Sequence, residues 1–295
     1  MTLSLILQAL QAGVTNGFIY ALVGMGLAVI FRGSRVINVM HGEFSVVGAM
    51  ATVLVLAAAK YPYWFAIIAG VLTGPAIGAL IELTLVRPMI RQQATEDQFV
   101  LLTIGLERAI AASVLFFIGR DGYLLPAFGG DHVFIVFDVV IREHALWLIA
   151  IALAVVIALR EFFRRTTLGL AITAASIDAD GAATTGINVA RMRTLTFVLG
   201  GLLGAIAGIL ITPLIAVDYT TGLPITLKGI AAAILGGFTN PLGAVVGGLT
   251  LGVIESLVIV GVSSGYKDVL TFSILIAIMI FMPHGILGRG GRGGG

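Results

Sequence analysis

The sequence predicts an all-α protein, a polytopic transmembrane bundle of eight or nine membrane helices, and three observations lead to this prediction. Hydrophobic residues make up 59% of the 295 residues and charged residues only 11%, whereas a soluble domain is roughly half apolar and a quarter charged. The mean hydropathy is +1.10. The apolar residues also gather in runs of the ~17–25 residues that cross a bilayer as a helix. Such a chain has too little polar surface to cover itself in water.

The apolar runs set the order of the expected helices. The run 224–238 is too short to span comfortably, carries Lys228 and lies between two prolines. It predicts a re-entrant or broken helix, which must be covered by protein or line a water-filled cavity. The runs long enough to span are 9–31, 36–59, 63–86, 98–118, 145–163, 194–217 and 241–261, with a shorter one at 268–283.

Charge and composition exclude several classes of function. The net charge is only +2, and the basic residues form short clusters between the apolar runs. This pattern is typical of orientation signals that place 160–193 in the cytoplasm, and it argues against nucleic acid as a partner. The absence of cysteine excludes disulfides and thiolate metal sites. No removable signal peptide is expected. We expect one transmembrane domain over residues 1–288 and a disordered Gly/Arg-rich tail at 289–295.

Two segments between or within the runs have a character of their own. The external segment 120–144 contains "HVFIVFDVVI", whose β-branched and aromatic residues predict a small strand pair. Glu107 and Arg108 lie near the middle of an apolar run, where ionisable groups are costly and usually face a bundle interior or a cavity. A functional site, ion pairs with other helices and a shifted helix end all fit this position.

The cytoplasmic segment 164–193 predicts a short helix between two membrane helices. Asp178 can cap its first turn, and Gly186 suits the left-handed position after its end. The helix between them, Ala179–Thr185, consists largely of small residues. Either a partner packs onto it or it is a plain loop helix. A Walker A site is excluded, because none of the three lysines follows a glycine.

The stretch "RVINVMHGEF" places polar groups at the start of the apolar run 36–59. Asn38, His41 and Glu43 could belong to a metal site, a catalytic pair or a structural anchor. Chemistry would need further ligands, and the external histidines lie on the opposite face in this topology, so catalysis and metal binding are not predicted. Gly42 would let another backbone come close. A structural anchor for helix packing is favoured, with a gating or pathway function kept open.

Three blocks carry a resemblance to a known family. Residues 16–50, 166–210 and 227–256 resemble, in this order, the N-terminal signature, the cytoplasmic loop with the following helix, and the C-terminal signature of branched-chain amino acid ABC transporter permeases. The chain departs from the family at "GLAITA", where basic residues are usual, and at Gly181, where a glutamate is frequent.

The resemblance implies the membrane-spanning permease subunit of an ATP-driven ABC importer in the cell inner membrane, which translocates branched-chain or related amino acids. It implies a second homologous permease subunit, two ATP-binding subunits and an external solute-binding protein. ATP and Mg would be bound by partner subunits, so this chain would be no enzyme and bind no cofactor. Urea, amides or other small polar solutes are alternative substrates, and an ATP-independent channel or secondary transporter is the alternative class.

The resemblance and the patterns above give three sets of candidate residues. The ATPase-coupling loop comprises Asp178, Ala182, Ala183, Gly186, Ile187 and Asn188; the helix-packing or gating set comprises Asn16, Tyr20, Asn38, His41, Gly42 and Glu43; the candidate pathway set comprises Lys228, Gly236, Gly237 and Asn240.

Overall fold

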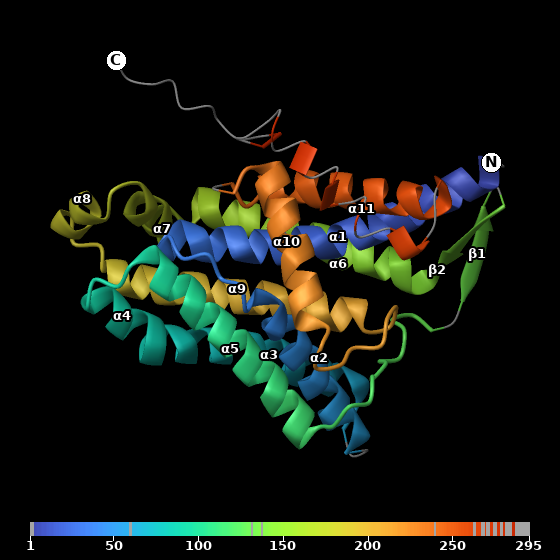
Figure 1. The fold of residues 1–295 in the computed structure, drawn as a ribbon, viewed down its shortest axis with the longest axis horizontal. Helices are drawn as coiled ribbons and strands as arrows, with labels where there is room; N and C mark the ends of the chain where they lie inside the picture. Colours follow the sequence, from blue (N-terminus) through green and yellow to red (C-terminus); the bar gives the residue numbers. More distant parts are fainter. Residues whose placement is uncertain are drawn as a thin grey trace. The chain divides into compact units, whose positions relative to one another are not determined.

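The computed structural model describes residues 3–58, 61–130, 132–136, 138–238, 240–261 and 264–266, and 269, 272–273, 276–277, 280 and 285–286 beyond them. It is mostly helical (Figure 1), which confirms the predicted polytopic helix bundle. Among these residues, six helices are long and apolar enough to cross a membrane: α1 (Leu3–Ser34), the span Tyr63–Arg91, α5 (Glu96–Phe117), α6 (Glu143–Arg165), α9 (Val189–Ile211) and α11 (Gly243–Gly261). Three apolar helices are shorter: α2 (His41–Ala57), α7 (Thr167–Ile177) and α10 (Gly222–Gly236).

Two predicted boundaries differ from the observed helices for local reasons. The run 36–59 becomes helical only at His41, because Arg35 adopts a φ of 58° and breaks the chain out of α1. The run 194–217 is helical over Val189–Ile211, and Pro213, which lacks an N–H group, follows directly in a turn.

The short run 224–238 forms α10, which is one unbroken helix of 15 residues. Pro224 lies in its first turn, where the missing N–H group would have no helical partner. The segment is a short helix, as predicted, but the alternative of a broken helix is wrong; a re-entrant position in the membrane stays a prediction. Most of the predicted run 268–283 and the tail 289–295 lie outside the described residues.

The chain divides into two compact units. The central unit comprises residues 29–126 and 155–227, and the terminal unit comprises residues 1–28, 127–154 and 228–295. The divisions fall within α1, α6 and α10, so each of these helices contributes to both units.

The central unit is built on α2, α3 (Tyr63–Ile81) and α9, which pack against one another. Glycines at four-residue spacing lie along their contact faces. A Cβ added to Gly74 would overlap the backbone of Gly201, and the reverse is also true. Such contacts let membrane helices approach closely and gain dispersion energy along their length.

The span Tyr63–Arg91 is not α-helical throughout. Its middle part is η1 (Glu82–Val86), a turn of π-helix, and it continues as α4 (Arg87–Arg91). The segment between α6 and α9 holds α7 and the six-residue α8 (Ala179–Thr184). An apolar core lies among α1, α2, α3, η1, α5 and α9, and its buried members are Ile30, Val36, Met40, Phe44, Ile81, Val86, Phe99 and Phe197.

The terminal unit contains the first part of α1, the end of α10, α11 and a hairpin. Glycines of α11 lie against the α1 backbone, so that a Cβ on Gly248 or Gly252 would overlap it. The strands β1 (Val133–Val136) and β2 (Val139–Arg142) pair antiparallel, which confirms the predicted strand pair.

Candidate functional site

The first turn of α2 touches the first turn of α10. The Gly42 N–H group donates to Thr226 Oγ1 at 2.7 Å, and this hydroxyl donates to the Gly222 carbonyl at 3.0 Å. A Cβ on Gly42 would overlap the Gly222 carbonyl oxygen, and a Cβ on Gly222 would overlap the Glu43 carboxylate. The two helix starts can therefore meet only because both positions are glycine.

Four polar side chains at and just before the start of α2 are buried. Each has at least one polar atom that makes no hydrogen bond with any of the described residues. Asn38, His41, Glu43 and Ser45 are at most 1% exposed. The unpartnered atoms are Nδ2 of Asn38, both ring nitrogens of His41, both carboxylate oxygens of Glu43 and Oγ of Ser45. Buried groups of this kind are usually satisfied by ordered water or by another molecule. The cluster can therefore hold water or a polar group, with the Glu43 carboxylate beside the α10 N-terminus.

Lys228 lies in a buried ion pair in the terminal unit. Its Nζ is 2.6 Å from Glu255 Oε1 and 3.2 Å from the Tyr20 hydroxyl. The Tyr20 hydroxyl donates to Glu255 Oε2 at 2.8 Å. These three side chains join α1, α10 and α11. The sequence prediction missed Glu255, although it is the one carboxylate in the apolar run 241–261 and must therefore have a partner.

The other candidate pathway residues form the turn between α10 and α11. Gly237 has a φ of 93°, and its carbonyl accepts from the Asn240 N–H group at 2.9 Å. The Asn240 side chain accepts from the Leu242 N–H group at 3.1 Å. A Cβ on Gly236 would overlap the backbone of the α11 start. Asn16 is half-buried on α1, away from this turn in sequence.

The segment 164–193 has the capped geometry that the sequence predicted. The Asp178 carboxylate accepts from the Gly181 N–H group at 2.9 Å and caps α8. Gly186 has a φ of 88°, and the N–H groups of Gly186 and Ile187 donate to carbonyls of α8 at 3.0 and 3.1 Å. Asn188 caps α9 by accepting from the Arg191 N–H group at 3.0 Å. Within the loop Ala182 is buried, while Ala183 and Asn188 are exposed.

A buried ionic network, which sequence reasoning missed, fixes the start of α9 to the π-helical turn. Glu82 is 0% exposed. Its carboxylate accepts from Arg87 at 3.0 and 3.2 Å, from Arg193 Nε at 3.0 Å and from the Thr194 hydroxyl at 2.7 Å. Arg193 and Thr194 follow the α8 loop by only one turn of helix. We call this network the Glu82 clamp.

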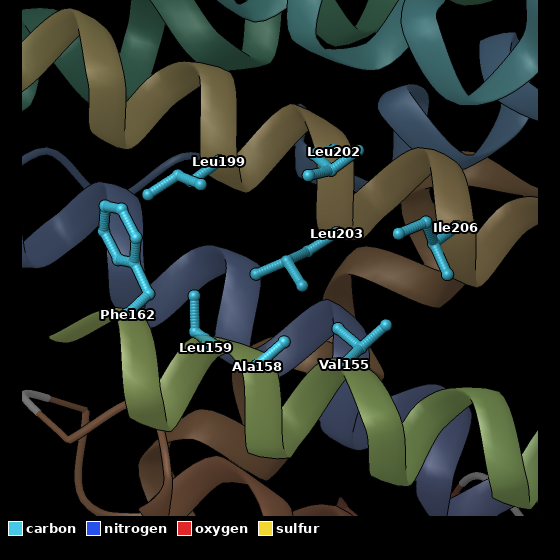
Figure 2. A pocket seen from close by; sticks show the side chains of 8 residues that line it. All are labelled: Val155, Ala158, Leu159, Phe162, Leu199, Leu202, Leu203 and Ile206. Carbon is cyan, nitrogen blue, oxygen red and sulfur yellow. The ribbon is translucent and has the colours of Figure 1, made fainter. Parts of the chain in front are cut away.

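An apolar pocket of about 270 Å³ lies between α6 and α9, and its lining differs from the polar clusters described above. Figure 2 shows its side chains pointing toward one another across the two helices. A pocket without polar groups cannot pair with a zwitterion, so it is no candidate for binding one. The lining residues are Val155, Ala158, Leu159, Phe162, Leu199, Leu202, Leu203 and Ile206.

Comparison with known proteins gives a consistent result. The family model described as "Branched-chain amino acid transport system / permease component" matches residues 9–279. The high-affinity branched-chain amino acid transport system permease protein LivH of Salmonella typhimurium is 30% identical over 96% of both chains. The corresponding permease protein BraD of Pseudomonas aeruginosa is also 30% identical over 96% of both chains.

A more distant relative and one solved structure extend the comparison. The galactofuranose transporter permease protein YtfT of Escherichia coli is 27% identical over 83% of this chain and 68% of its own length. A chain of the PsaBC structure from Streptococcus pneumoniae, in complex with Fab, shares the fold with a TM-score of 0.53 and 16% identity. That match covers 96% of this chain and 92% of the other.

Proposed function

Because the chain belongs to the family of permease components of branched-chain amino acid transport systems, we propose that it provides half of the translocation path of an ATP-driven importer. In this proposal it pairs with a second homologous permease subunit in the cell inner membrane. Two ATP-binding subunits hold ATP and Mg, and an external solute-binding protein delivers branched-chain or related amino acids. The chain itself carries out no chemistry.

The observation that carries the proposal is the capped helix α8 within a chain that matches the permease family over 9–279. The helix is short, and Asp178 and the left-handed Gly186 hold its two ends. Because its side chains are small, the helix is narrow enough to fit into a groove of another protein. We propose that α8 and the residues up to Asn188 dock on an ATP-binding subunit.

The Glu82 clamp gives the proposed coupling a mechanical route. A displacement of α8 is transmitted to α9 through the short link that ends at Asn188. The Glu82 clamp holds the start of α9 against η1. Because α3 and α9 also pack along their length, α3 and α9 would move together. In this proposal closure of the ATPase subunits tilts this pair and converts an inward-facing path to an outward-facing one.

Other small polar solutes, such as urea, amides or sugars, form the second candidate substrate class. The likeness to a galactofuranose transporter permease favours keeping it. Assays of the solute-binding protein that accompanies this chain decide between the two classes, since the binding protein largely sets specificity in the family that the chain resembles.

Gentle purification of the chain from its native membrane tests the assembly. Recovery of ATP-binding subunits and a second permease supports the importer, whereas a stable assembly of this chain alone supports the alternative of a channel or secondary transporter.

The variant Gly186→Val tests the docking helix, because valine at a φ of 88° is strained and should distort the end of α8. We expect it to lose the ATPase subunits while it still inserts in the membrane. Gly119→Val is the matched control, since Gly119 also has a positive φ, of 110°, with open space around it. Equal loss of the ATPase from both variants, or retention by Gly186→Val, contradicts docking by α8.

A further inference from the structure

Arg108 lies near the middle of a membrane-spanning helix and yet is exposed. Helix α5 runs from Glu96 to Phe117, and Arg108 is nine residues before its end. At 1.5 Å per residue this is roughly 14 Å from one end and roughly 18 Å from the other. The Arg108 side chain is 67% exposed in this chain. The helix end is well defined, so a shifted helix end does not explain the position of the guanidinium.

A mid-helix arginine of this kind is not suited to face hydrocarbon. Ionisable groups at such depth are costly and usually face a bundle interior or a water-filled cavity, and snorkelling to the interface serves residues near helix ends. The exposed side chains around Arg108 include the small residues Ala109 and Ala112, and a Cβ added to Gly105 would meet no atom within 4 Å. The face therefore leaves room beside the guanidinium.

The Glu107 carboxylate beside Arg108 fixes the orientation of the guanidinium and leaves donors free. Its Nε is 2.9 Å from Glu107 Oε2, and Glu107 is 3% exposed. Glu107 lies one turn beyond Thr103, whose hydroxyl contacts the Val39 N–H group at the start of the α2 region. Among the described residues the Glu107 carboxylate is the one polar contact of Arg108, so the Arg108 Nη groups remain free to donate.

We propose that Arg108 faces the translocation pathway and binds the carboxylate of a zwitterionic amino acid through its Nη groups, with Glu107 as its positioning residue. A guanidinium fork matches a planar carboxylate with two parallel, charge-assisted hydrogen bonds. The inference rests on the proposed importer function and adds to it a substrate-binding residue. A single charged group of this kind can hold the substrate briefly without trapping it.

Thiol chemistry tests whether Arg108 faces water, because the chain contains no cysteine. In the assembled transporter, Arg108→Cys should react with a membrane-impermeant, positively charged methanethiosulfonate. Ile157→Cys is the matched control, since Ile157 is 52% exposed near the middle of α6 and should face lipid. Failure of Arg108→Cys to react overturns the proposal, and cross-linking of this cysteine to the second permease assigns Arg108 to the subunit contact instead.

Transport measurements test the function of the charge. In proteoliposomes that hold the full assembly, Arg108→Ala should lower amino acid uptake by about 10- to 100-fold, the usual loss for a hydrogen bond to a charged group. Arg108→Lys, which keeps the charge and N–H donors but not the planar fork, should retain part of the uptake, which separates a lost charge from misfolding. Arg120→Ala, just beyond the end of α5, is the control and should transport normally.

The outcomes separate this inference from the proposed function. Normal uptake by Arg108→Ala in an ATP-dependent wild-type system overturns the inference and leaves the importer intact. Absence of ATP-dependent uptake in the wild-type assembly overturns the proposed function itself.

Discussion

Replacement of Glu82 with leucine should destabilise the central unit, because it removes the acceptor shared by three side chains. The carboxylate is fully buried and accepts at 2.7–3.2 Å from Arg87, Arg193 and Thr194. The side chain of Arg193 is only 10% exposed, so the variant leaves its charge buried without a counter-charge. Removal of one partner from a buried ion pair costs about 3–5 kcal/mol. We expect a loss in this range for Glu82→Leu.

The matched control removes all three charges of the clamp. Replacement of a buried ionic triad with apolar residues of similar size is often neutral or stabilising. The triple variant Glu82→Leu, Arg87→Leu, Arg193→Met should therefore lie within about 1 kcal/mol of the wild type. Thr194 keeps a partner in this variant, because its hydroxyl also donates to the Ala190 carbonyl at 3.0 Å.

Thermal unfolding in detergent, followed by size-exclusion chromatography with fluorescence detection, measures both variants. At about 2–4 °C per kcal/mol, the single variant should lower the unfolding midpoint by roughly 6–20 °C. The triple variant should recover nearly all of this loss. If the triple variant unfolds as early as Glu82→Leu, the cause is lost packing and the electrostatic reasoning is refuted. An unchanged midpoint for the single variant would refute it as well.

Two further predictions use the same kind of reasoning. Lys228→Met should lower the unfolding midpoint by a similar amount, because it leaves the buried Glu255 carboxylate without its cation. The double variant Lys228→Met, Glu255→Leu should recover most of this loss. A double variant that unfolds as early as Lys228→Met would contradict this account. Burial acts to raise the pKa of Asp218, but hydrogen bonds from Thr220 and Thr221 outweigh it and hold the pKa below its ordinary value of 3.8. This carboxylate therefore stabilises its turn above that value and ceases to do so as the pH falls through the lowered pKa. Amide hydrogen exchange at Thr220, corrected for its intrinsic pH dependence, should be slow at neutral pH and become fast in strong acid. In Asp218→Ala the Thr220 amide should exchange fast at every pH.

The sequence predicted the features that depend on local rules. Hydrophobic run length set the membrane helices, and β-branched residues set the hairpin at 133–142. The side chain of Asp178 and the left-handed conformation of Gly186 fixed α8 to within one residue. Each of these depends on interactions between residues at most a few turns apart.

The sequence did not predict which distant polar groups meet. Glu82 and Arg193 are 111 residues apart, and Lys228 and Tyr20 are 208 apart. Their pairing depends on the arrangement of helices in space, which run length and capping rules do not contain. A lone carboxylate in an apolar run signals that a partner must exist, because an unpaired charge at that depth is costly. It does not say which residue the partner is.

The π-helical turn at Glu82–Val86 also has a consequence for length variation among related permeases. Residues five apart lie about 140° around an α-helix, whereas the i→i+5 bonds of a π turn bring Glu82 and Arg87 onto one face. Deletion of one residue between them would let this turn close as an α-helix, with the two side chains four residues apart and again on one face. Arg87 would keep the carboxylate, and Met89 and Ile90 would keep the apolar core they pack against. A single-residue gap at this place in a relative would therefore mark an α-helical span with the same clamp, whereas a gap within the α-helical part would rotate everything beyond it by about 100°.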